Sequence, residues 1–420
     1  MRAPADIFRL ESFGGFYYSR RTRETVAFPA AYADFLLETT RRPADRILRD
    51  DRDRFAQIRR RRKRTLEQWQ RDGILDAELR CRARVVANRP PSGVLGAPLA
   101  TSFEITERCN LRCQHCYVER GAARRPEVSP AVLGRAFAEL DRAGSPAVTL
   151  SGGEPLMRRD VWEILDRARD HQLEIKFCTN ATLVDRVAAR RLVCYPIHTF
   201  SISLEGASAA VHDRGRGSGN FERVARGVAL LRDAGAARIM LRITVTSHNL
   251  ATLPEIAAVG DGWGVDAISF RPYRYNGAAL DSTLVVERAA YDRAMRRLKR
   301  GWRARCKGVF GRSLPTRSPS FARYVPRFGC IGGNGTLSVK ADGSGVACAT
   351  VRSSGEWNLE QHSLIDCWYR DPAINRWRQM QAPAVCRDCD RLAECGGGCR
   401  ARAYAMGQGI AGPDPWCCSR

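Results

Sequence analysis

Strand-like and helix-like segments alternate through the middle of the chain, and this pattern limits the possible folds more than any other feature. The strand-like segments lie at 101–106, 147–150, 174–179, 199–204, 238–246 and 267–273. Helical apolar periodicity follows them at 130–143, 160–171, 185–193, 221–234, 253–259 and 286–303. Six β-then-α units in succession predict an α/β parallel sheet or partial barrel with helices outside. In such sheets the chemistry lies at the C-terminal strand ends.

The segments on either side of this region have a different character. Before residue 90, two short strand-like runs flank Gly14-Gly15 and a third covers 24–28, with helical patterns at 30–39 and 55–72. This order predicts a small α+β unit. After residue 301 the chain is rich in Cys, Gly and Arg, and we expect that it buries little core and needs metal centres as staples. The expected divisions are 1–90, 99–303, a connector at 304–329, and 330–420.

Cysteine usage indicates metal or cluster ligation. The chain has 16 cysteines, of which three lie between Cys109 and Cys116 and nine between Cys330 and Cys418. No apolar run is long enough to span a membrane and the first ten residues lack a signal-peptide core, so we expect a soluble cytoplasmic protein whose thiols stay reduced. Four cysteines that stand apart from these spacings are expected to be small buried residues without a role. They are Cys81, Cys178, Cys194 and Cys367.

The net charge of +24 permits two explanations. Only five of the 69 basic residues are lysine, an arginine excess that a GC-rich genome would produce whatever the function. The alternative is an acidic partner, since net charge reports on association rather than on fold. The basic run 59–64 is most simply a solvated helix face, with a phosphate contact as the sharper option.

Two motifs follow the first two predicted strands. Cys109, Cys113 and Cys116 form a CxxxCxxC triplet, which can hold three irons of a [4Fe-4S] cluster and leave the fourth open. A zinc site is the alternative, although closed zinc sites need four ligands. Gly152-Gly153-Glu154 follows the second strand, where the glycines let backbone approach a ligand and the carboxylate can bind an ammonium group.

These two motifs together resemble the radical S-adenosylmethionine (SAM) superfamily over about residues 99–303. The resemblance implies a (β/α)6 partial barrel whose open iron binds SAM, and whose reductive cleavage of SAM yields a hydrogen-abstracting 5′-deoxyadenosyl radical. It assigns Cys109, Cys113 and Cys116 as cluster ligands. It also assigns SAM contacts, which are Tyr117 near adenine, Gly152, Gly153 and Glu154 at the methionine amino group, and Asn180 and Ser203 at later strand ends.

The cysteine spacing of the tail resembles the SPASM domain of radical SAM maturases, which holds two auxiliary [4Fe-4S] clusters. The resemblance assigns Cys330, Cys348 and Cys399 to the first of these clusters. The second would take Cys386, Cys389, Cys395 and either Cys417 or Cys418. The first cluster has no obvious fourth ligand, because 324–329 contains no cysteine. Either Cys306 reaches in or one iron stays open to substrate. Paired zinc knuckles remain the alternative for this tail.

The N-terminal unit resembles the winged-helix precursor-recognition element of enzymes that mature ribosomal peptides. The resemblance rests on element order, on residues 13–18 and on residues 69–75. It implies that a leader peptide adds as a strand to the edge at 24–28, and a basic protein would suit an acidic leader.

The leading hypothesis is a radical SAM peptide maturase that forms a crosslink, thioether or excised product, supplied with electrons by a flavodoxin or ferredoxin. The second is an anaerobic sulfatase-type maturase that oxidises Ser or Cys to formylglycine. The resemblance gives such enzymes an aspartate base after the second tail cysteine, where this chain has Ala349. The third is a basic zinc protein that binds nucleic acid. No catalytic acid or base stands out among the histidines, including His115 and His212.

Overall fold

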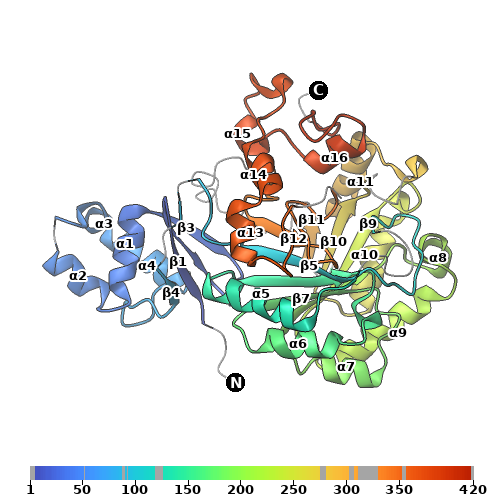
Figure 1. The fold of residues 1–420 in the computed structure, drawn as a ribbon, viewed down its shortest axis with the longest axis horizontal. Helices are drawn as coiled ribbons and strands as arrows, with labels where there is room; N and C mark the ends of the chain where they lie inside the picture. Colours follow the sequence, from blue (N-terminus) through green and yellow to red (C-terminus); the bar gives the residue numbers. More distant parts are fainter. Residues whose placement is uncertain are drawn as a thin grey trace.

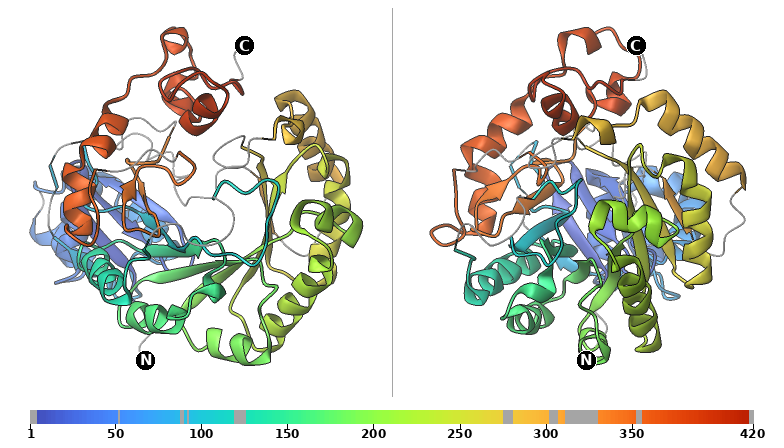
Figure 2. Two further views of the ribbon diagram at one scale, coloured as in Figure 1. Left: turned by 45° about the vertical axis from the view of Figure 1, so that its right-hand side comes forward. Right: turned by 90° about the vertical axis from the view of Figure 1, so that its right-hand side faces the viewer.

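The computed structural model describes residues 5–51, 53–87, 90–91, 93–118, 126–274, 281–301, 307–310, 330–351 and 356–417. Its largest element is a curved sheet with the strand order β11-β10-β9-β8-β7-β6-β5-β12-β13. Helices cover the outer side of the curve, and the views in Figures 1 and 2 show the arc from three directions. No described helix is long and apolar enough to cross a membrane.

The six predicted central strands are confirmed. They are β5 (Ala100–Thr106), β6 (Ala147–Gly152), β7 (Glu174–Thr179), β8 (Ile197–Ser203), β9 (Ile239–Val245) and β10 (Ala267–Pro272). All neighbouring pairs among them are parallel. The edge strand β11 (Lys307–Phe310) continues the parallel pairing beyond β10. The chain is therefore an α/β protein with a partial barrel, as the alternation predicts.

The helices that follow these strands are also in the expected places. They are α5 (Pro130–Arg142), α6 (Val161–Arg169), α7 (Arg186–Leu192), α9 (Asn220–Asp233), α10 (Leu253–Gly262) and α11 (Arg288–Gly301). The helix α8 (Ala209–Arg216) precedes α9 and was not predicted. Short 3-10 turns are η1 (Pro155–Met157), η2 (Leu250–Thr252) and η3 (Ser282–Leu284).

The barrel core lies between the strands and these outer helices. Alternate residues of each strand are apolar and fully buried against the helices, as Phe103 of β5 is against Phe137 of α5, with ring centroids 5.2 Å apart. Since side chains alternate across a strand, the intervening residues face the inside of the arc. Most of those inward residues are polar, which leaves the inner face available for chemistry.

The N-terminal unit has a four-stranded sheet with the order β3-β2-β1-β4. Its strands are β1 (Ile7–Glu11), β2 (Gly14–Tyr18), β3 (Thr25–Pro29) and β4 (Arg84–Val86). Its helices are α1 (Ala30–Thr39), α2 (Ala44–Asp50), α3 (Ala56–Arg60) and α4 (Arg62–Arg71). The single helix expected at 55–72 is thus two helices with a break at Arg61, and α2 was missed. Like charges three and four residues apart disfavour one continuous helix through the basic run.

The first part of the tail belongs to the barrel. Strand β12 (Thr336–Val339) pairs in parallel with β5, and β13 (Gly345–Val346) pairs antiparallel with β12. The helices α13 (Leu364–Arg370) and α14 (Pro372–Gln379) follow. Trp368 is fully buried in the barrel core and its indole N–H donates to the Leu95 carbonyl at 2.7 Å. The expectation that the tail buries little core is wrong for this part, because the apolar residues of β12 and α13 are too scattered to show a period.

The last part of the tail consists of short elements joined by turns. They are η4 (Ala384–Cys386), α15 (Leu392–Cys395) and α16 (Arg400–Ala405). In Figure 2 this red segment lies at the open side of the arc, opposite the strands.

Candidate active site

The first three predicted cysteines lie on one loop, residues 107–118, which leaves the C-terminal end of β5. We call it the Cys loop. Cys113 is buried and Cys109 and Cys116 are partly buried. Burial, and then the charges of Glu154, Cys113 and Cys116, raise the pKa of Cys109 to about 11, so the other two thiols lie within electrostatic reach of Cys109.

The sulfur atoms of the Cys loop accept hydrogen bonds. The Leu111 amide donates to Cys109 Sγ at 3.4 Å, and the Asn180 side-chain amide reaches the same sulfur at 3.9 Å. An Arg216 guanidinium N–H donates to Cys113 Sγ at 3.6 Å. Donors at sulfur stabilise thiolate and tune cluster potentials, so the surroundings suit cluster ligands.

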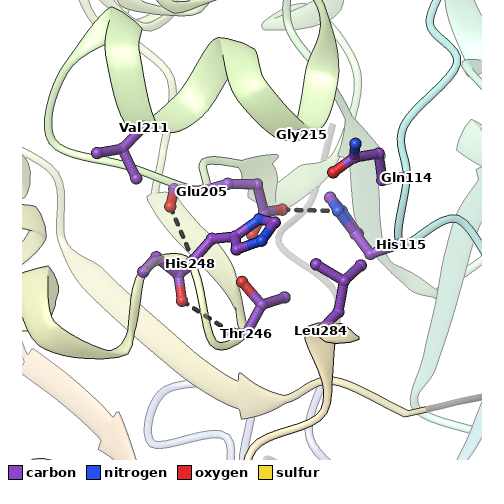
Figure 3. A pocket seen from close by; sticks show the side chains of 9 residues that line it. Gln114, His115, Glu205, Val211, Gly215, Thr246, His248 and Leu284 are labelled. Carbon is purple, nitrogen blue, oxygen red and sulfur yellow. Dashed lines mark hydrogen bonds and ion pairs between the residues drawn. The ribbon is translucent and has the colours of Figure 1, made fainter. Parts of the chain in front are cut away.

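A buried ion pair that sequence reasoning missed holds the Cys loop in place. Glu205, directly after β8, accepts from Arg216 at 2.7 Å and lies 3.2 Å from His115 of the Cys loop. Burial opposes ionisation, but His115 and Arg216 outweigh it and lower the pKa of Glu205 to about 2. Figure 3 shows Glu205 and His115 facing each other across a small hollow. No spacing rule joins positions 115, 205 and 216, so only the fold brings them together.

The predicted glycine pair makes its close approach to the Cys loop itself. The Gly153 amide donates to the Thr106 carbonyl and the Glu154 amide to the Arg108 carbonyl, both at 2.8 Å. A Cβ on Gly152 would lie 2.3 Å from the Thr106 oxygen, and one on Gly153 would lie 2.2 Å from the Arg108 oxygen. Any side chain here would therefore push the Cys loop away from β6.

Glu154 is buried and ties the ends of β6 and β7 together. Its carboxylate accepts from the Asn180 amide at 2.7 Å, the Thr179 hydroxyl at 2.8 Å and the Leu156 amide at 3.3 Å. Burial raises the pKa of Glu154 to about 7. A carboxylate has about four acceptor positions, so one remains for an ammonium group.

Asn180 and Ser203 occupy strand ends beside the Cys loop. The Asn180 side chain donates to Asn110 at 2.9 Å, and its carbonyl oxygen accepts from Thr182. Asn180 therefore links the Cys loop to the end of β7, in addition to any contact that it makes with a ligand. Ser203 is partly buried at the end of β8, on the same inward side as Tyr117 of the Cys loop, whose neighbours include Glu104 and Arg242.

Three predicted tail cysteines come together. Cys330, Cys348 and Cys399 pack around one small apolar cluster that contains Ala347 and Trp377. Burial, and then the charges of Cys348 and Cys399, raise the pKa of Cys330 to about 11. The Arg274 guanidinium lies within electrostatic reach of all three thiols. Cys306, the candidate fourth ligand, and residues 324–329 lie outside the described residues.

Three further tail cysteines lie on one compact segment. Cys386 ends η4, the Cys389 amide donates to the Cys386 carbonyl at 3.2 Å, and Cys395 ends α15. Cys417 is positioned by Asp414, whose carbonyl accepts from the Cys417 amide and whose carboxylate accepts from the Cys399 amide. Cys418 lies outside the described residues, so the choice between Cys417 and Cys418 stays open.

In the described part of the chain, no three His, Cys, Asp or Glu side chains converge on the position of a single metal ion. Thiolates that bind separate irons of a cluster need not converge in this way. Among the isolated cysteines, Cys81 and Cys367 are buried as expected. Cys178 is partly buried and Cys194 is exposed, so the expectation of burial is wrong for Cys194.

A hollow lies beside the ion pair that Glu205 forms with His115 of the Cys loop. It encloses about 280 Å³, part of which is open to solvent. Its lining comprises Gln114, His115, Glu205, Val211, Gly215, Thr246, His248, Asn249 and Leu284, as drawn in Figure 3. The residues come from the Cys loop, from the segments that follow β8 and β9, from α8 and from η3, at the edge where parallel sheets place their chemistry.

Comparisons with known proteins agree with this geometry. The model of the radical SAM superfamily matches residues 103–258. Mycofactocin maturase MftC of Mycobacterium ulcerans is 30% identical over 332 residues, covering 77% of this chain and 88% of the relative. PqqA peptide cyclase of Ruegeria pomeroyi is 27% identical and covers 78% of this chain and 89% of the relative.

A solved structure covers nearly the whole chain. Streptococcus suis SuiB bound to its precursor peptide SuiA has a TM-score of 0.74 at 17% identity, covering 98% of both chains. At this identity the likeness shows the fold alone. It extends over the N-terminal unit, the barrel and the tail.

Proposed function

Because the chain belongs to the radical SAM superfamily, we propose that it is a maturase that abstracts hydrogen from a residue of a ribosomally made precursor peptide. The observation that carries this proposal is the Cys loop, whose first residues are held against Gly153 and Glu154 by backbone hydrogen bonds. Two relatives named above are a maturase and a peptide cyclase, and the solved structure of similar fold holds a precursor peptide.

The Cys loop fits the SAM-binding [4Fe-4S] cluster. Cys109, Cys113 and Cys116 would each hold one iron, and the SAM amino and carboxylate groups would take the fourth. Glu154 retains one acceptor position for the amino group, and Tyr117, Asn180 and Ser203 lie on the same rim. When bound and reduced, SAM supplies the 5′-deoxyadenosyl radical that abstracts hydrogen.

The tail would hold two auxiliary [4Fe-4S] clusters. Proximity of Cys330, Cys348 and Cys399 in one packed group supports the first, with Arg274 beside it as a compensating cation. The spacing of Cys386, Cys389 and Cys395, with Cys417 anchored through Asp414, supports the second. An external flavodoxin or ferredoxin would supply the electrons.

The leader of the precursor would dock on the N-terminal unit. Strand β3 lies at the edge of its sheet and so can accept an added strand. Phe28 of this strand packs edge-on against Trp69 of α4 at 5.2 Å, and Tyr32 of α1 meets the same ring at 6.2 Å. The edge is therefore backed by a rigid aromatic group.

Formylglycine formation on a sulfatase is the less favoured function. Ala349 follows Cys348 and offers no carboxylate at the position of the expected base. A zinc protein that binds nucleic acid is set aside, because family membership accounts for the Cys triplet and for the barrel.

The decisive experiment is co-expression with the short open reading frame nearest the gene, followed by mass spectrometry. A mass change in the peptide that depends on Cys113 supports the proposal, and an unmodified peptide beside a protein that cleaves SAM contradicts it. Anaerobic reconstitution should give about twelve irons per chain, four for each cluster.

Cysteine variants resolve the clusters separately. Cys348→Ala and Cys389→Ala should each remove about four irons, whereas the exposed Cys194→Ala should remove none. Fewer than about five irons in the wild-type protein would exclude the three-cluster assignment.

A further inference from the structure

The inner face of the barrel carries an excess of positive charge. Lys176 of β7, Arg242 of β9 and Arg271 of β10 alternate with the buried apolar residues Phe177, Leu241 and Phe270, and so point inward. Each of the three cations lies within electrostatic reach of at least one of the others. Arg274 follows β10 and extends this group toward the tail cysteines.

Carboxylates among the described residues of the six strands offset little of this charge. Glu104 of β5 faces inward and lies near Tyr117. Glu174, at the start of β7, is held by Tyr18, Arg20 and Arg23 of the N-terminal unit. Among the described residues of the six strands, three inward cations thus accompany one inward carboxylate. Burial, and then repulsion from Arg242 and Arg274, lower the pKa of Arg271 to about 9. Burial lowers the pKa of Lys176 to about 8, with Cys178 opposing the shift and Arg242 and Arg271 adding to it.

Two buried hydroxyls lie on the same inner face as these cations, and neither forms a hydrogen bond with a described residue. Ser201 of β8 is 2% exposed and Ser269 of β10 is 0% exposed, and neither hydroxyl has a hydrogen-bond partner among the described residues. Ser269 pairs directly with Arg242 in the sheet register, and Ser201 pairs with Met240 on the same strand. Buried polar groups without partners are uncommon in proteins, and a bound ligand or an ordered water can supply the missing partner.

The cations remain reachable from solvent. Lys176, Cys178, Arg242 and Arg271 are all partly rather than fully buried. Guanidinium groups bind carboxylates through paired hydrogen bonds, and serine hydroxyls donate to the same acceptors.

We propose that Arg242 and Arg271, with the hydroxyls of Ser201 and Ser269, bind a carboxylate of the substrate peptide inside the barrel. The carboxylate is an Asp or Glu side chain or the peptide C-terminus. Lys176 contributes charge from beneath. This inference rests on the proposed function, which it extends by naming the chemistry of the modified segment. Under the proposed function, the carboxylate of SAM would instead bind the open iron at the Cys loop.

Cys178 provides a reporter that needs no knowledge of the peptide. It lies on β7 near Lys176, Arg271 and Tyr117, whereas Cys194 is exposed outside the barrel. The reconstituted protein with SAM is treated with iodoacetate or with neutral iodoacetamide, and both cysteines are followed by peptide mapping. The ratio of the iodoacetate rate to the iodoacetamide rate should be about tenfold higher at Cys178 than at Cys194, because nearby cations attract the anionic reagent.

Variants assign this preference to named residues. Arg242→Gln and Arg271→Gln should each lower the ratio at Cys178 toward that at Cys194, and Arg226→Gln on the outer face of α9 should leave it unchanged. Equal ratios at the two cysteines in the wild-type protein, or a ratio at Cys178 that neither variant alters, would overturn the proposal.

The precursor peptide identifies the source of the carboxylate. Asp and Glu of the modified segment are replaced by Asn and Gln, and separately the C-terminus is amidated. One of these changes should raise KM about tenfold or more, which corresponds to the loss of a charged hydrogen bond. In the Arg271→Gln variant, the changed peptide and the unchanged peptide should then have the same KM. A KM that depends on neither carboxylate would refute the inference while leaving peptide modification intact. A failure of peptide modification would instead refute the proposed function, and the Cys178 ratio would still decide the charge site.

Discussion

At the residue scale, the site depends on buried charges that stabilise each other. Arg216 reaches Glu205, His115 and Cys113 Sγ at once, so one guanidinium connects α8, the β8 end and the Cys loop. Its cation and its N–H···S bond would both favour the more negative, reduced state of the cluster that we propose Cys113 holds.

Arg216→Gln should therefore lower the midpoint potential of the SAM-binding cluster by about 60 mV, equivalent to a tenfold change for one electron. A redox titration followed by electron paramagnetic resonance measures this shift. Arg214→Gln is the matched control, since Arg214 lies on the same helix but is exposed. An unchanged potential in Arg216→Gln would contradict the assigned role.

His212 of the same helix should make the protein sensitive to acid. Its ring is fully buried and accepts from the Glu205 amide at 3.1 Å. Burial, and then Arg216, lower the pKa of His212 to about 4. In the unfolded chain this histidine therefore binds a proton near pH 6.5, whereas in the folded chain it does so only near pH 4. The free energy of unfolding therefore decreases as the pH falls below 6.5.

Between pH 7 and pH 5 this histidine should cost about 2 kcal/mol of the free energy of unfolding. Urea unfolding at the two pH values measures it. His212→Leu should show a correspondingly smaller loss, whereas His171→Leu, nearer the surface, should keep the wild-type loss. Equal acid sensitivity in His212→Leu and the wild-type protein would refute the prediction.

At the element scale, β3 decides how a leader can bind. The Ser19 amide donates to the Glu24 carbonyl, so the hydrogen-bonded pairs of the β2–β3 hairpin recur at Tyr17 with Val26 and at Gly15 with Phe28. Ala27 pairs with Phe16 in a non-hydrogen-bonded pair of the hairpin. Its amide therefore points away from β2, to the free edge of the sheet. Although Ala27 is buried, its amide is the donor that a strand added to β3 would meet.

Ala27→Pro should weaken leader binding about tenfold or more, because proline removes that donor while the hairpin ladder keeps its own bonds. Fluorescence anisotropy of a labelled leader gives the dissociation constant. Ala27→Ser retains the amide and should bind as the wild-type protein does. Full affinity in a folded Ala27→Pro variant would show that the leader docks elsewhere.

At the scale of the whole molecule, the N-terminal unit is locked to the barrel by buried charge. Arg9 and Glu11 are 1% and 0% exposed and paired at 2.6 Å. Arg9 also donates to the Ala97 carbonyl at 2.9 Å, and Glu11 accepts from the Gly96 amide at 2.9 Å. A leader on β3 would therefore be held at a set position relative to the Cys loop.

Arg9→Met should lower the free energy of unfolding by about 3–5 kcal/mol, because it leaves Glu11 buried without its cation. The double variant with Glu11→Met should regain part of this loss. Urea unfolding measures both. The exposed pair of Arg49 and Asp45 is the control, and Arg49→Met should cost less than about 1 kcal/mol. A double variant less stable than Arg9→Met would contradict the electrostatic explanation.

The sequence alone determined the barrel and its chemistry. The six strands and the helices after them were predicted within a few residues, because each buries one apolar face and therefore shows its period. The Cys triplet and Gly152-Gly153-Glu154 were also readable, since loop residues that serve one site stand at short fixed spacings.

Only the tertiary structure decided which distant residues meet. One buried charged cluster is formed by Glu205, Arg216 and His115. The inner face of the barrel collects Lys176, Arg242 and Arg271. Each of these six is an ordinary polar residue in the sequence. The pairing of β12 with β5 was likewise not predicted. Contacts of this kind depend on strand order and on burial, which a linear pattern of residue types does not contain.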